Sequence, residues 1–177
     1  LLARHAKFLF YRGARKQALD AMDESIQLLE GTENDEELAF ALSIYADALG
    51  YMGDFKKSLY LCDRSLTIFR ETNDRWGIAT ALNNLGVSYY YLENYNHSIV
   101  HFEESMSISR EIGDISGVTA ILSNLGAIAH DQQQYDHAID LYNESMRLSE
   151  KLHDQYGVAS IQVNLGWTLF VTGKYQQ

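Results

Sequence analysis

Two histidines four positions apart are the first residues in this chain whose types and spacing could support chemistry. A helix would place His97 and His101 on one face with Glu104 nearby, and this spacing can hold a zinc ion. The pair lacks the glutamate directly after the first histidine that zinc peptidases carry, and His137 repeats His97 forty residues later. We therefore expect these histidines to lie on a repeated outer surface, and we expect no metal site.

Nucleophilic and phosphate-binding groups are equally sparse. The single cysteine, Cys62, has no indicated base to activate it, and it occupies the repeat position that Phe102 and Tyr142 take later in the chain. We therefore expect Cys62 to be buried and to act as a small hydrophobic side chain. Gly113 and Asp114 fall at a predicted helix junction, and no glycine-rich phosphate loop is present. The sequence predicts a protein that is not an enzyme and that uses no cofactor.

A forty-residue repeat organises the elements that must position any site. The tetrad Asn-Asn-Leu-Gly at 83–86 recurs as Ser-Asn-Leu-Gly at 123–126 and as Val-Asn-Leu-Gly at 163–166, and residues 75–114 and 115–154 are identical at 13 of 40 positions. A fixed period of this length is the signature of a stacked repeat array. We predict one array over residues 1–177, with repeats at about 1–33, 34–73, 74–113 and 114–153 and a half-repeat at 154–177. The chain starts with leucine, and we expect it to be a fragment of a larger protein.

Each repeat has the pattern of two helices. Asp74 offers a carboxylate cap before a run of apolar residues at helical spacing, and a second apolar run begins at Tyr95. Asp114 and Asp154 repeat the cap, and Asn34 stands at the equivalent earlier position. We expect all four to satisfy free amides at a helix start.

Small residues form two columns along these helices. Gly86, Gly126 and Gly166 lie in mid-helix, where glycine costs about 1 kcal/mol relative to alanine, so we expect close approach of the partner helix to offset that cost. Ala6 and Ala46 take the same position in earlier repeats. The second column is serine, and we expect its hydroxyls to bond to the carbonyl four residues earlier; its members are Ser25, Ser65, Ser105 and Ser145.

These columns resemble the tetratricopeptide repeat (TPR). The repeat at 74–113 shows the pattern best, with Leu82, Leu85-Gly86 and Tyr89 in its first helix and Ser98, Phe102 and Ser105 in its second. The missing proline and the forty-residue period resemble the long variety found in kinesin light chains, polarity scaffolds, and signal-transduction ATPases related to the maltose-regulon activator. Peptide-sensing bacterial quorum regulators use similar units. The resemblance implies an all-α, right-handed α-solenoid of about nine helices.

In such arrays the first helices line a concave groove, so the resemblance also implies a binding surface. Counting from each Leu-Gly pair gives the expected peptide-binding residues: Asp47, Tyr51, Asn83, Asn84, Val87, Tyr90, Tyr91, Ser123, Asn124, His130, Asn164, Trp167 and Phe170. Asn84, Asn124 and Asn164 form a ladder whose amides could pair with an extended peptide backbone, or could tie adjacent repeats together. Neither lysine nor arginine occurs at these positions, which argues against a clamp for a C-terminal carboxylate.

The composition of the chain limits the classes of partner that it can bind. The net charge of −10 opposes direct contact with nucleic acid or anionic lipid, and there is no apolar run of about eighteen residues that could span a membrane. A lone cysteine fits a cytoplasmic location. We therefore expect a module that binds a protein or peptide; the alternative is a regulatory or sensor domain of a larger signal-transduction ATPase or transcriptional regulator. We also expect self-association through the half-repeat, where Trp167 and Phe170 would be exposed.

Overall fold

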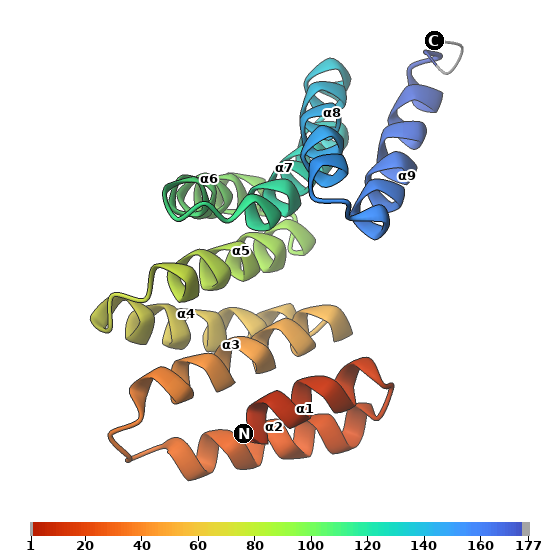
Figure 1. Cartoon of the computed structure of the whole chain (residues 1–177). Helices are drawn as coiled ribbons and strands as arrows, with labels where there is room; N and C mark the ends of the chain where they lie inside the picture. The colour runs from red at the N-terminus through yellow and green to blue at the C-terminus, as the bar shows by residue number, and fades with distance from the viewer. Residues whose placement is uncertain (1, 175–177) are drawn as a thin grey trace. The chain divides into compact units, whose positions relative to one another are not determined.

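The computed structural model describes residues 2–174, and the whole of this part of the chain folds as α-helices joined by short turns (Figure 1). The nine helices of the described residues are α1 Leu2–Tyr11, α2 Arg15–Leu29, α3 Asp35–Met52, α4 Phe55–Glu71, α5 Arg75–Tyr91, α6 Tyr95–Glu111, α7 Ile115–Asp131, α8 Tyr135–Lys151 and α9 Gln155–Val171. The all-α class is therefore confirmed. The last three residues of the predicted half-repeat, 175–177, lie outside the described residues.

The chain divides into two compact units, residues 1–108 and 109–177. In the N-terminal unit, α1 packs on α2 and α3 on α4, and the first helices α1, α3 and α5 lie side by side. In the C-terminal unit, α8 packs between α7 and α9. The prediction of a single array over residues 1–177 stays a prediction.

Two of the three mid-helix glycines lie against an aromatic ring of the partner helix. A Cβ built on Gly86 would lie 2.6 Å from Cδ1 of Phe102 in α6, and one on Gly126 would lie 2.7 Å from Cε1 of Tyr142 in α8. Both rings are fully buried. At Gly166 in α9, such a Cβ would meet no described atom within 4 Å beyond its chain neighbours and the nearby backbone of its own helix. The expected close approach therefore occurs in two of the three repeats, through side chains packed on bare backbone.

The serine column stabilises the hairpins differently from the prediction. Ser105 donates to the carbonyl of Ala79 at 2.7 Å, and Ser145 donates to the carbonyl of Thr119 at 2.8 Å. Both bonds cross from a second helix to the first helix of the same repeat, while Ser65 donates to the carbonyl three residues before it. The prediction of bonds to the carbonyl four residues earlier is wrong at these three serines, because the opposite helix brings a closer acceptor to two of them.

The aspartate caps form as predicted at three of four positions. Asp74, Asp114 and Asp154 each accept the backbone N–H of the residue three positions later at 2.9 Å, at the starts of α5, α7 and α9. The prediction for Asn34 is wrong, since its side chain makes no capping bond. Three acidic residues in the first turn of α3 supply negative charge there instead.

Candidate functional site: an inner groove in the N-terminal unit

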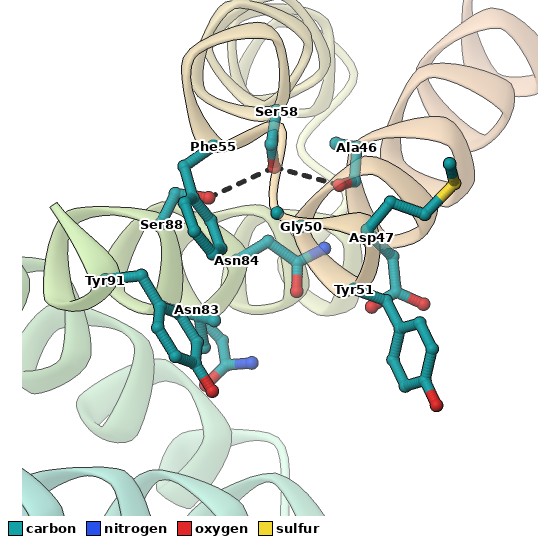
Figure 2. A pocket seen from close by; sticks show the side chains of 13 residues that line it. Ala46, Asp47, Gly50, Tyr51, Phe55, Ser58, Asn83, Asn84, Ser88 and Tyr91 are labelled. Atoms are coloured by element: carbon teal, nitrogen blue, oxygen red, sulfur yellow. Dashed lines mark hydrogen bonds between the residues drawn. The ribbon is translucent and has the colours of Figure 1, made fainter.

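A cavity of about 530 Å³ opens between α3 and α5, beside the start of α4 (Figure 2). We call it the inner groove. Thirteen residues line it: Ala46, Asp47, Gly50, Tyr51, Met52, Gly53, Phe55, Ser58, Asn83, Asn84, Val87, Ser88 and Tyr91. Because α3 and α5 are the first helices of consecutive repeats, the groove lies on the face that the repeat pattern predicts.

Two buried hydroxyl groups fix the three helices that form the groove. Ser58 of α4 donates to the carbonyl of Ala46 in α3 at 2.8 Å, and it accepts from the Ser88 hydroxyl of α5 at 3.0 Å (Figure 2). Both serines are almost completely buried. Bonds between buried groups hold their geometry because breaking one leaves a polar atom without water. The walls of the groove are therefore held in a defined position.

The α3 wall carries a carboxylate and an aromatic ring one turn apart. Tyr11 at the end of α1 favours the charged form of the Asp47 carboxyl, and the Tyr51 ring meets the ring of Phe10 edge-on, with centroids 5.6 Å apart. The groove walls desolvate the Asp47 carboxyl and raise its pKa, although the charge of Lys7 opposes that rise. Tyr51 itself is 72% exposed, so its ring is accessible from the groove.

The α5 wall carries amides and an aromatic stack. The amides of Asn83 and Asn84 project from α5 (Figure 2). Among the described residues, the Asn84 side chain has no hydrogen-bond partner, so its donor and acceptor are available to a ligand. Phe55, the first residue of α4, stacks on Tyr91 with ring centroids 4.7 Å apart and planes 10° apart. This stack gives the groove an apolar surface beside its polar amides.

The inner groove brings together six of the thirteen predicted binding residues, namely Asp47, Tyr51, Asn83, Asn84, Val87 and Tyr91. Tyr90 lies outside the cavity lining and packs against Tyr91 at 5.1 Å. Whether these residues bind a ligand stays a prediction.

The other six predicted residues belong to the C-terminal unit. Ser123 and Asn124 line a separate cavity of about 260 Å³ between α7 and α9. His130 pairs through Nδ1 with the Thr168 hydroxyl at 2.9 Å. Asn164, Trp167 and Phe170 line a shallow hollow on α9, where the two rings stack at 5.8 Å. Trp167 is 60% exposed, and the self-association that we expect through this helix stays a prediction.

Sequence reasoning missed the contribution of the second helix and of α1. It counted groove positions only from the Leu-Gly pairs, so it omitted Phe55 and Ser58 of α4 and Tyr11 of α1. One available signal was the aromatic column, because Phe55 takes the position of Tyr95 and Tyr135 in later repeats. The forty-residue period also marked the other two, because Ser58 shares its repeat position with Ala18, Ser98 and Ala138, and Tyr11 shares its position with Tyr51 and Tyr91.

The reactive side chains considered at the outset lie elsewhere. The ring of Tyr89 stacks on both His97 and His101, with centroids 5.2 and 5.4 Å apart. Burial lowers the pKa of His101, and burial raises the pKa of Cys62 to about 12, which makes its thiol a poor nucleophile at neutral pH. Within residues 2–174, no three potential metal ligands come together, and no helix has the length and apolar character to cross a membrane.

A groove lined by the first helices of stacked hairpins defines the class of helical-repeat proteins that present a concave surface. Comparison of the sequence with family models identifies the family: a tetratricopeptide repeat model matches residues 37–111 and 117–177. The chain belongs to the tetratricopeptide repeat family. In addition, residues 1–50 match a model of anaphase-promoting complex subunit 5. No curated protein is similar enough in sequence to count as a relative.

Solved structures with the same fold support this assignment. A Rap protein in complex with competence and sporulation factor superposes with a TM-score of 0.89 at 15% identity, over 99% of this chain and 49% of the Rap chain. BtubC (BKLC) from P. vanneervenii superposes with a TM-score of 0.80 at 18% identity, over 97% of this chain and 71% of the BtubC chain. Kinesin light chain TPR-like repeats from Podosopora anserina superpose with a TM-score of 0.71 at 12% identity, over 99% of this chain and 87% of the repeat chain.

At these identities the likeness is one of fold, and the predicted TPR-type solenoid is confirmed. The likeness to kinesin light chain repeats agrees with the long variety that the sequence resembles. The chain spans about half the length of the Rap protein.

Proposed function

We propose that this chain is a protein-interaction module that holds an extended segment of a partner protein in the inner groove. The observation that carries the proposal is the groove itself, a cavity whose walls combine the Asn84 amide with exposed tyrosines. The hydrogen-bonded Ser58 and Ser88 hold these walls in place, so little ordering of the groove is needed on binding.

The chemistry of the lining suits a peptide. The Asn84 amide offers a donor and an acceptor, which match the alternating N–H and C=O groups of an extended backbone. Tyr51 and Tyr91 present large rings that lose little conformational entropy on contact, and such residues dominate interface energies. The net charge of −10 disfavours nucleic acid and anionic lipid as occupants.

The experiment selects a random dodecapeptide display library on the full chain and tests the enriched peptides against Val87→Trp. Because Val87 lines the groove, an indole there fills the space that a peptide needs, and we expect at least a tenfold loss of affinity. Val100→Trp is the matched control, since Val100 is 60% exposed on α6 and does not line the cavity. Enriched peptides that bind Val87→Trp as tightly as the wild type would refute the proposal.

A second candidate is a regulatory domain of a larger signal-transduction ATPase or transcriptional regulator. The fold likeness to a Rap protein that was solved with a bound factor favours it. The test measures nucleotide hydrolysis and DNA binding by the complete gene product, with and without a selected peptide. A response that Val87→Trp abolishes would support regulation through the groove. If a peptide binds but changes neither activity, the regulatory role is refuted and the interaction module remains as the proposed function.

A further inference from the structure

The inner groove has one charged group among its lining residues, and that group is the carboxylate of Asp47. The remaining polar groups of the lining are neutral amides and hydroxyls, and no lysine or arginine is among them. A ligand that enters the groove therefore meets a single negative charge at the α3 wall. An anionic side chain placed there would be repelled and would find no counter-charge in the lining.

The environment of Asp47 leaves its charge incompletely compensated. Tyr11 and the charge of Lys7 both favour the charged form of Asp47, yet desolvation by the groove outweighs both. The pKa of Asp47 is therefore raised. Asp47 is exposed in the groove, so a cation that arrives with a ligand can reach the carboxylate and favour its charged form.

The aromatic ring beside Asp47 also favours a cation. Tyr51 follows Asp47 by one helical turn and lies on the same wall. The guanidinium of Arg15 lies 5.8 Å from the centroid of the Tyr51 ring, within the range of a cation–π contact. Arg15 already occupies one such position, and because Tyr51 is still 72% exposed, ring surface is left for a ligand cation to contact. The Phe55–Tyr91 stack on the α5 side has no charged partner of this kind in the cavity lining.

Building on the proposed function, we propose that the inner groove selects a partner segment that carries a lysine or arginine, whose cationic group pairs with Asp47 beside the Tyr51 ring. An apolar neighbour of that basic residue contacts the stacked rings of Phe55 and Tyr91. The net charge of −10 raises the local concentration of cationic segments and so favours their encounter with the groove.

The test uses peptides that the library selection enriches and that Val87→Trp excludes. For each peptide, the affinities of the parent and of a version with its lysine or arginine replaced by glutamine are measured by fluorescence polarisation. We expect at least a tenfold loss with the wild type and a loss of twofold or less with Asp47→Asn. Asparagine has nearly the shape of aspartate, so the variant removes the charge and little else. Asp20→Asn, an exposed site on α2, is the matched control and should behave as the wild type.

The possible outcomes separate this inference from the proposed function. Peptides that bind in the groove without a basic residue would overturn the inference and leave the proposed function intact. The same holds if replacing the basic residue by glutamine lowers the peptide affinity equally for the wild type and for Asp47→Asn. If Val87→Trp excludes none of the enriched peptides, both fail. A tenfold loss that depends on Asp47 and that weakens at high salt supports both.

Discussion

Gly86→Ala adds one methyl group at the point where the Phe102 ring lies against α5. The added Cβ would come within 2.6 Å of two ring atoms, closer than carbon atoms can approach, and the ring is fully buried. In an exposed helix the same change stabilises a protein, because alanine is favoured over glycine by about 1 kcal/mol. The direction of the effect is therefore set by packing.

The expected magnitude follows from these two contributions. Overpacking a buried site costs about 1–3 kcal/mol, and the helix propensity of alanine returns about 1 kcal/mol. Gly86→Ala should therefore lower the free energy of unfolding by about 0–2 kcal/mol. Gly166→Ala is the matched control, because its Cβ would meet no described atom within 4 Å beyond its chain neighbours and the nearby backbone of its own helix, and it should raise that free energy by about 0.5–1 kcal/mol.

Urea denaturation followed by circular dichroism at 222 nm measures both changes, with the shift in midpoint as the readout. The double variant Gly86→Ala/Phe102→Cys gives an internal check. It reproduces the residue types of the preceding repeat, where Ala46 and Cys62 occupy these two positions and are both buried. In the Phe102→Cys background the added methyl should stabilise. Equal stabilisation by Gly86→Ala and Gly166→Ala would refute the packing argument.

Two further predictions concern the helix starts and the pH dependence of stability. Asp74→Ala removes an N-cap hydrogen bond and should lower the free energy of unfolding by about 1 kcal/mol. Asn34→Ala loses no such bond and should change that free energy by about a few tenths of a kcal/mol. Equal losses of the two variants in urea titrations would contradict the assignment of Asp74 as a cap. Burial lowers the pKa of His101 in the folded state. As the pH falls through about 6.5, the unfolded chain therefore takes up a proton at His101 more readily than the folded chain, and the free energy of unfolding falls. His101→Phe should therefore lose less stability than the wild type between pH 7.5 and 5.5, and identical pH profiles would exclude His101 as a source of this dependence.

The sequence by itself predicted the helical hairpins and the helix face on which the inner groove lies. Asp74 can be read as a cap because the amide that it satisfies lies three residues away in the chain. Gly86 and Phe102 can be read as a packed pair because their types change together between repeats, from Ala46 with Cys62 to glycine with an aromatic ring. These features depend on local geometry and on the forty-residue period, and both can be recognised in the amino-acid sequence alone.

Only the tertiary structure decided which side chains meet across helices. The hydroxyls of Ser105 and Ser145 find acceptors twenty-six residues away, and Tyr11 reaches Asp47 from the end of α1. Phe55 enters the groove because the turn before α4 directs the start of a second helix toward α5. Such contacts depend on distances between segments that are remote in sequence. The repeat pattern predicts that these segments pack, but not which atoms come within hydrogen-bonding or stacking distance.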